Sequence, residues 1–369
     1  MQDALPVGTK VSSWRVDGEL GRGGMASVHA VTHGKFGKRA AIKIAHRSIL
    51  TDSYNPRTFL REARIVHRID HPAVIDVFAT GSIGGRPYLV MEKLEGMSLG
   101  YRLDQGFVSR AEAFEILIEL CDVLRAAHAA GVVHRDLKLD NVYICADTFA
   151  GGRRVKLLDW GVAFVQGEED PFRGLIAGTL TYVAPEQIRG DALTPAADIY
   201  SLAVLAYHLL CRRPPFAART DVELIKLHLR AEPPHPREAW PTIPADLDAL
   251  LVSMLAKNPA ERPSLDEVER VLRDRLAQIA PVSAPETRRR LARGSHPAIP
   301  TAAIQEAVAA EAQAQAEAQA ASDRALAMIR LPIDVLGRPA LLPCPPFSPV
   351  WAALAIAMAA LIGLLSALP

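Results

Sequence analysis

One segment near the middle of the chain, residues 134–141, constrains the fold and the chemistry more than any other. It reads His-Arg-Asp-Leu-Lys-Leu-Asp-Asn. In this segment Asp136 can accept a proton from a hydroxyl group, Lys138 can face a phosphate, and the side-chain oxygen of Asn141 can bind Mg²⁺. Phosphoryl transfer needs this combination, because the protein must aim the nucleophile, hold the phosphates and neutralise negative charge. A polar surface loop is the alternative that this segment alone leaves open.

Two predicted strands upstream, residues 14–20 and 27–32, frame a turn that is rich in glycine. The turn contains Gly21 and Gly23, and glycine lets a backbone approach phosphate oxygens closely and adopt a positive φ. Hairpin turns also use glycine for purely structural reasons. The turn alone is therefore weak support for a phosphate site.

A lysine in the middle of the next predicted strand indicates a charged partner. Residues 40–45 read Ala-Ala-Ile-Lys-Ile-Ala, and Lys43 is expensive to bury in so apolar a strand unless its charge is paired. A nucleotide phosphate is one candidate partner. The other is Glu62, on a predicted helix with Asn55 as its cap and Pro56 at its first position. An ordinary solvated glutamate is the alternative for Glu62.

Four further motifs follow downstream. Residues 155–161 are a predicted buried strand that ends in Asp159 and a glycine, and Asp159 is a candidate second ligand for Mg²⁺. The other three are Gly-Thr-Leu-Thr-Tyr-Val-Ala-Pro-Glu at 178–186, Asp-Ile-Tyr-Ser-Leu at 198–202 and Asn-Pro-Ala-Glu-Arg-Pro at 258–263.

The order and spacing of these motifs resemble the protein kinase family, and most closely its bacterial, eukaryotic-like serine/threonine branch. The resemblance covers roughly residues 8–278 and implies a two-lobed α+β fold. A small, β-rich N-lobe over residues 8–94 would be followed by a larger, helical C-lobe over residues 95–280. ATP and Mg²⁺ would bind between the two lobes.

The same resemblance implies a role for each motif residue. Lys43 would hold the α- and β-phosphates of ATP and pair with Glu62. Asp136 would be the catalytic base, and Lys138 would contact the γ-phosphate. Gly21 and Gly23 would lie over the phosphates, and Asn141 and Asp159 would bind Mg²⁺. Met91 would be the gatekeeper, and Glu92 and Leu94 would belong to the hinge. The residues implied to lie around the adenine are Val28, Ala41, Leu94 and Tyr143.

The resemblance also implies contacts that hold the site together. Asp198 would brace the catalytic loop, and Glu186 would form a buried ion pair with Arg262. Trp160 stands where the family usually has phenylalanine. Its expected neighbours are His134, Val66 and Val77.

The segment that precedes the Ala-Pro-Glu motif bears on the substrate and on regulation. In the family, a lysine at the place of Lys138 and a Gly-Thr at the place of Thr179 accompany serine or threonine acceptors. Between residues 160 and 178 this chain has no Ser, Thr or Tyr, and it carries the acidic run 168–170. Arg135 resembles the arginine that a phosphorylated loop neutralises in many relatives. We hypothesise that the acidic run pairs with Arg135 in place of a phosphate, with a charged loop in water as the alternative.

Composition limits the class of protein. Of the 369 residues 50% are hydrophobic, which is enough for a substantial core. The net charge of +1 argues against a general nucleic-acid binder. The four cysteines are isolated along the chain, so neither a zinc site nor a disulfide framework is indicated, and a reduced, cytoplasmic setting fits. The first residues lack the apolar stretch of a signal peptide.

The C-terminal part of the chain differs in composition from the rest. Residues 281–349 are predicted to be a partly helical or disordered linker rich in Pro, Ala, Arg and Gln. Within it, residues 301–330 favour a solvated helix over an oligomerising coil, and a homodimer stays open. Residues 350–368 carry no charge and are long enough to cross a bilayer, with a buried terminal helix as the alternative. We therefore expect a single-pass membrane protein whose kinase domain, residues 8–280, lies in the cytoplasm.

Two other classes of function stay open at this point. A pseudokinase that serves as a binding scaffold would typically have lost Lys43, Asp136 or Asp159, and all three are present. A small-molecule kinase would share the base and the metal ligands but not the motifs at 178–186 and 198–202. We therefore expect an ATP-dependent serine/threonine protein kinase that acts on protein substrates at the cytoplasmic face of the membrane.

Overall fold

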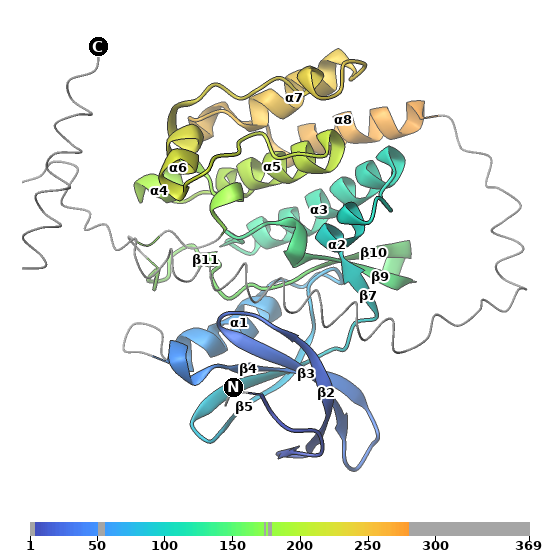
Figure 1. Cartoon of the computed structure of the whole chain (residues 1–369), viewed down its shortest axis with the longest axis vertical. Helices are drawn as coiled ribbons and strands as arrows, with labels where there is room; N and C mark the ends of the chain where they lie inside the picture. Colours follow the sequence, from blue (N-terminus) through green and yellow to red (C-terminus); the bar gives the residue numbers. More distant parts are fainter. Residues whose placement is uncertain (1–3, 51–55, 173–174, 176–178, 280–369) are drawn as a thin grey trace, which may run out of the picture. The chain divides into compact units, whose positions relative to one another are not determined.

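The structure, a computed structural model, describes residues 4–50, 56–172, 175 and 179–279. This part of the chain forms two lobes (Figure 1). The smaller lobe is built around a β-sheet and the larger lobe is mostly helical, as the sequence predicts. The predicted linker over 281–349 and the predicted membrane helix over 350–368 lie outside the described residues.

The smaller lobe contains an antiparallel sheet of six strands in the order β1-β2-β3-β4-β6-β5. Because side chains alternate along strand β4, Ile42 and Ile44 face one side, where they join a small core of their own. Ala41 and Ala45 face the main core, and Lys43 between them points the same way, toward helix α1. The elements are β1 (Lys10–Val11), β2 (Trp14–Arg22), β3 (Ala26–His33), β4 (Arg39–Ala45), α1 (Pro56–Arg68), β5 (Val77–Ile83) and β6 (Arg86–Met91).

The larger lobe packs its helices around α3 and α5, whose apolar residues make up much of the main core. Helices α3 and α8 each begin after a serine cap, since the Ser109 and Ser264 hydroxyls accept hydrogen bonds from the Glu112 and Glu267 backbone N–H groups, each at 3.2 Å. The helices are α2 (Leu99–Asp104), α3 (Arg110–Ala129), α4 (Pro185–Arg189), α5 (Ala196–Cys211), α6 (Asp221–Arg230), α7 (Ala245–Met254) and α8 (Leu265–Gln278).

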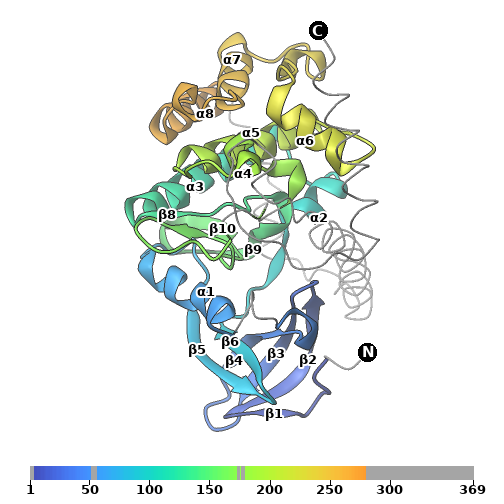
Figure 2. The ribbon, with the colours of Figure 1, turned by 90° about the vertical axis from the view of Figure 1, so that its left-hand side faces the viewer.

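Short strands of the larger lobe lie where it faces the smaller lobe (Figure 2). They form a three-stranded sheet in the order β10-β9-β7 and a two-stranded pair of β11 with β8. The strands are β7 (Gly96–Ser98), β8 (Val132–Val133), β9 (Val142–Phe149), β10 (Arg153–Leu157) and β11 (Phe164–Val165). The segment 134–141 follows β8, and Asp159 follows β10, so this arrangement carries both to the junction of the lobes.

Single 3₁₀ turns complete the described fold. They are Arg47–Ile49, Leu139–Asn141, Ala150–Gly152, Leu180–Tyr182, Pro236–Glu238 and Pro259–Glu261. The turn Leu139–Asn141 lies within the catalytic segment, and Leu180–Tyr182 directly follows Thr179.

Candidate active site

Lys43 meets two carboxylates at the junction of the lobes. Its Nζ lies 2.8 Å from Glu62 Oε2 and 3.0 Å from Asp159 Oδ1. The predicted pair of Lys43 with Glu62 is therefore present, and Glu62 is buried rather than solvated. Strand β4, helix α1 and the segment after β10 are joined at this one ammonium group.

The pKa values of these three groups depend on their burial and on the attraction between the ammonium and the two carboxylates. The charge of Lys43 lowers the pKa of Asp159 to about 2, although burial opposes the shift. Burial raises the pKa of Glu62, and Lys43 counteracts this only in part. Desolvation disfavours the charge of Lys43, but the two carboxylates outweigh it and raise the pKa of the ammonium. Asp159 therefore stays ionised at neutral pH, as a metal ligand must.

The side chain of Asp198, in the first turn of α5, holds the catalytic loop from below. Its Oδ2 accepts a hydrogen bond from the His134 N–H at 2.9 Å, and its Oδ1 accepts one from the Arg135 N–H at 3.0 Å. His128 Nε2 lies 2.8 Å from Oδ2. Burial would raise the pKa of Asp198, but these partners outweigh it and lower the value. The bracing role implied for Asp198 thus has a direct geometric basis.

Asp136 lies among donors that fix both of its carboxylate oxygens. Its Oδ1 accepts a hydrogen bond from the Thr179 backbone N–H at 2.8 Å. Its Oδ2 lies 3.1 Å from both Lys138 Nζ and Asn141 Nδ2. Lys138 Nζ also donates to Thr179 Oγ1 at 2.9 Å. The sequence indicates Thr179 as a marker of the acceptor class, and the structure adds its direct contacts with Asp136 and Lys138.

Two residues of the site have left-handed backbone conformations that are uncommon outside glycine. Arg135 has φ of 70° and Asp159 has φ of 60°. Such residues cost of order 1–3 kcal/mol each and persist only where the surroundings hold them. Arg135 is held by Asp198, and Asp159 is held by Lys43. The strain therefore coincides with the residues that flank the proposed base and form the proposed metal site.

The donor set fits Mg²⁺ in composition. Among the described residues, no three or more His, Cys, Asp or Glu side chains gather closely enough to hold a metal by themselves. Mg²⁺ is commonly held by one or two protein ligands together with substrate phosphates and water. The amide nitrogen of Asn141 donates to the Asp136 carbonyl at 2.8 Å, which leaves the amide oxygen for a metal. The Leu158 N–H donates to the Asn141 carbonyl at 2.8 Å, so the segments that carry Asn141 and Asp159 adjoin.

Packing does not require glycine at either predicted position, although Gly21 lies within strand β2, opposite Val28, and not in the turn that the sequence predicts. A Cβ atom built on Gly21 meets nothing within 4 Å, and one on Gly23 comes only within 3.7 Å of the Ala26 carbonyl oxygen. Neither glycine has a positive φ, contrary to the general expectation for such turns. Close approach of a ligand to the backbone is the remaining physical reason for these glycines.

The predicted adenine residues come from β3, β4, the hinge after β6, and β9. Ala41 and Met91 are paired across β4 and β6. Val28, Leu94 and Tyr143 are partly buried, whereas Ala41 is buried. Val28 and Leu94 also pack against the main core, so their roles around adenine stay a prediction.

Trp160 is fully buried beside the catalytic loop. Its ring centroid lies 4.5 Å from that of His134, with an interplanar angle of 65°, so the predicted contact with His134 is present. Val66 and Val77, the other two predicted neighbours, belong to the same core cluster. The indole Nε1 donates to the Leu157 carbonyl at 3.1 Å, which satisfies the one polar group of the buried ring.

The acidic run reaches two separate groups of cations. Asp170 binds Arg135 with both carboxylate oxygens, one of them 2.9 Å from Nη1. The hypothesised pairing of the run with Arg135 is therefore confirmed for Asp170. Glu168 pairs instead with two arginines of helix α1, lying 3.2 Å from Arg68 and 3.8 Å from Arg61. The run thus joins the helix that carries Glu62 to the catalytic loop.

A family model, the protein kinase domain, matches residues 14–272. The chain belongs to the protein kinase family. The chain is 36% identical over 290 residues to serine/threonine-protein kinase Pkn1 of Myxococcus xanthus, covering 78% of this chain and 41% of that protein. It is 33% identical over 251 residues to serine/threonine-protein kinase PknB of Mycobacterium tuberculosis, covering 66% and 39%.

A solved structure shows the same fold. The kinase domain of PknI from Mycobacterium tuberculosis superposes with a TM-score of 0.58 and 25% sequence identity, covering 74% of this chain and 99% of that one. This chain spans about two fifths of the length of the curated relatives Pkn1 and PknB. In the part of the chain that the structure describes, no helix is both long and apolar enough to cross a bilayer.

Proposed function

We propose that this chain is an ATP-dependent serine/threonine protein kinase that transfers the γ-phosphate of ATP to protein hydroxyl groups. The observation that carries the proposal is the gathering of the proposed catalytic side chains at one place. Lys43 contacts Asp159, and Asp136 contacts Asn141 and Lys138. The hydrogen bond from Leu158 to Asn141 joins the two groups. Its curated bacterial relatives, which carry serine/threonine-protein kinase in their names, support the same reaction.

The geometry supports a distinct role for each side chain. Asp136 takes the proton of the acceptor hydroxyl, and the Thr179 N–H holds its carboxylate in place. Lys138 supplies positive charge beside that carboxylate, and Lys43 is kept extended by Glu62 so that its ammonium can reach a phosphate. Asp159 and Asn141 would hold Mg²⁺, which, when bound, neutralises phosphate charge and orients the phosphates. No covalent intermediate with the protein is required.

Transfer of labelled phosphate tests the proposal. The full chain is incubated with γ-labelled ATP, Mg²⁺ and a generic protein acceptor, and Asp136→Asn serves as the inactive control. We expect label on serine or threonine that requires Mg²⁺ and is lost in the control. ATP binding without transfer would favour the pseudokinase scaffold. Transfer to small hydroxyl compounds but not to protein would favour a small-molecule kinase.

We also propose that the acidic run replaces a phosphorylated loop, so that activity needs no loop phosphorylation. Arg135 is 4% exposed in its side chain, and Asp170 is 15% exposed, so Asp170 supplies the counter-charge that this buried guanidinium needs. The pKa of Asp170 is lowered because Arg135 outweighs the effect of burial, which keeps the carboxylate charged at neutral pH. The segment thereby carries its own permanent negative charge at the place a phosphate would take.

Asp170→Asn is therefore expected to lower kcat about tenfold or more in protein freed of phosphate by phosphatase treatment. Loss of the pair is expected to leave the competent loop conformation populated less than about one tenth of the time, and kcat falls in proportion to that population. Glu169→Gln is the matched control, because it removes one charge from the same run but leaves the contacts of Asp170 and Glu168 intact. Full activity of phosphate-free Asp170→Asn would remove the proposal.

Membrane attachment through residues 350–368 is a further part of the proposed function, with residues 8–280 in the cytoplasm, where ATP is present. The uncharged, helix-length stretch supports it. Membranes from cells that express the full chain are extracted with carbonate and with high salt. A spanning segment predicts that the protein stays in the pellet until detergent is added, and release by carbonate would contradict it.

A further inference from the structure

A buried cation lies on strand β10, close to the proposed adenine end of the site. Lys156 is 7% exposed. Its ammonium donates to the carboxylate of Glu92 and, at 3.2 Å, to the Val74 carbonyl. It also lies 5.0 Å from the centre of the Phe149 ring. A charge this deeply buried is stable only because partners from the hinge and from the loop after α1 surround it.

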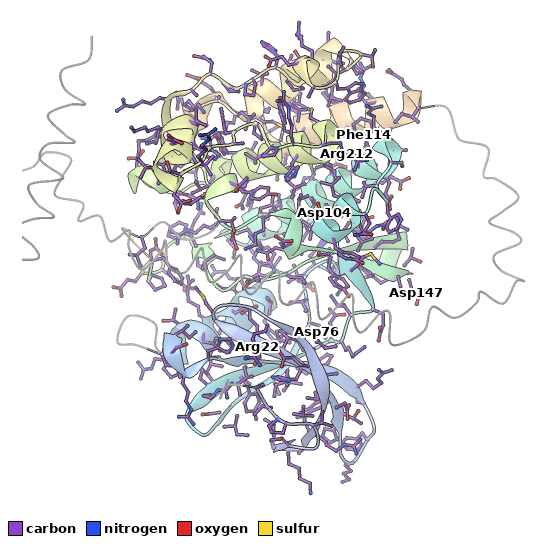
Figure 3. All side chains as sticks on the ribbon, in the orientation of Figure 1. Arg22, Asp76, Asp104, Phe114, Asp147 and Arg212 are labelled. Atoms are coloured by element: carbon purple, nitrogen blue, oxygen red, sulfur yellow. The ribbon has the colours of Figure 1, made fainter. Side chains whose placement is uncertain are left out.

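One oxygen of the Glu92 carboxylate, Oε1, accepts from two donors. Besides Lys156, its Oε1 accepts a hydrogen bond from the Asp76 N–H at 2.8 Å, and the Glu92 N–H donates to the Asp76 carbonyl at 2.9 Å. Figure 3 labels Asp76, which lies near the junction of the two lobes. Both the backbone and the side chain of Glu92 are therefore held in place.

The loop that carries Asp76 is itself attached to β10. The Leu157 N–H donates to the Ala73 carbonyl at 2.8 Å, and Val74 forms an isolated β-bridge with Leu157. Strand β10 continues within two residues to Asp159. One connected set of contacts therefore runs from the hinge to the proposed metal ligand.

Strand pairing places Lys156 beside the adenine residues as well. In the sheet β10-β9-β7, Lys156 lies directly opposite Tyr143, and Tyr143 lies opposite Ser98. Directly opposed side chains of an antiparallel pair project to the same face. The hydrogen bonds of Lys156 and Glu92 go to the hinge and the loop, and not to Lys43, Asp136 or Asp159, so any effect on the reaction passes through the backbone.

We infer that Lys156 and the Glu92 carboxylate are positioning residues for ATP. Their ion pair fixes the hinge backbone against β10, so that the adenine-binding residues and Asp159 keep the separation that one bound nucleotide requires. The family resemblance places Glu92 at the hinge without a role for its side chain, and it implies no role for Lys156. The inference rests on the proposed function, because it assumes that ATP occupies this cleft.

The test compares ATP affinity with catalysis in the full chain. Lys156→Gln and Glu92→Gln are expected to raise KM for ATP and the calorimetric Kd of Mg-ATP about tenfold. The kcat at saturating ATP and KM for the protein acceptor should change less than about twofold. The double variant should be no worse than either single variant, because both remove the same contact. Lys156→Arg should recover most of the affinity.

Arg154→Gln is the matched control, since it removes a cation from the same strand whose partner, Glu112, lies on helix α3. It should leave the KM for ATP unchanged. Wild-type ATP affinity in folded Lys156→Gln overturns the inference. Impairment of similar size in KM for ATP, KM for the acceptor and kcat also overturns it, because that result indicates general destabilisation. An inactive wild type that still binds Mg-ATP would refute the proposed function, while the Kd values would still decide the role of Lys156.

Discussion

Asp136→Asn is expected to lower kcat by about 10²- to 10⁴-fold, which is the usual contribution of a positioned general base. Asparagine has nearly the same shape, and its side-chain oxygen can still accept the hydrogen bond that Thr179 donates at 2.8 Å. The amide cannot take a proton from the acceptor hydroxyl, and its NH2 group replaces the oxygen that lies 3.1 Å from Lys138 and Asn141, so the variant loses the base and part of the contacts that position it. Lys43, Glu62 and Asp159 keep their own contacts, and Mg-ATP binding should persist.

The measurement is steady-state transfer of phosphate to a protein acceptor, with Mg-ATP binding followed by calorimetry. Asp147→Asn is the control, because it makes the same chemical change at an exposed position of β9 (Figure 3). Its kcat should match that of the wild type. A kcat for Asp136→Asn within about tenfold of the wild type would show that another group accepts the proton.

Arg262→Met is expected to lower the free energy of unfolding by about 3–5 kcal/mol. Arg262 and Glu186 form the predicted buried pair, with Nη1 to Oε1 at 2.6 Å and Nη2 to Oε2 at 2.8 Å. Their side chains are 0% and 1% exposed. Removal of the guanidinium strands a carboxylate that water cannot reach, and it also deprives the Ala196 and Ala256 carbonyls of their donor.

Urea denaturation followed by circular dichroism checks this expectation. Arg270→Met is the matched control, because its pair with Asp274 lies on the surface and should contribute no more than about 1 kcal/mol. Adding Glu186→Gln to Arg262→Met should recover part of the lost stability, since no uncompensated charge then remains. Equal decreases in the free energy of unfolding for Arg262→Met and Arg270→Met would show that the buried pair stabilises the protein no more than a surface pair does.

Much of the site could be predicted from local sequence because local physical rules act there. An ammonium in an apolar strand needs a counter-charge, and this rule alone predicted a charged partner for Lys43. A serine with a glutamate three residues later begins both α3 and α8, which is a capping pattern that can be read from the chain alone. The lack of hydroxyl residues beside an acidic run led to the hypothesis that the run pairs with Arg135, and the structure shows this pairing at Asp170.

Other contacts could not be predicted because they depend on how distant segments approach each other. Glu168 and Asp170 are near neighbours in an acidic run, yet one reaches Arg68 of helix α1 and the other reaches Arg135 of the catalytic loop. Nothing in the local pattern of three acids distinguishes them. The conformation of the loop between Phe164 and Phe172 brings Glu168 to one cation and Asp170 to the other.

The sequence by itself therefore determined the family, the two-lobed fold and the residue types that meet at the cleft, because motif order and the cost of unpaired charge are properties of the chain. Only the tertiary structure decided how the acidic run is divided between its cations, and which carboxylate pairs with Lys156. Lys156 and Glu92 are 64 residues apart, and each alone has the appearance of an ordinary charged residue. Their pairing arises because β10, the hinge and the loop after α1 converge around the Lys156 ammonium and bury it, and a buried ammonium needs a carboxylate partner.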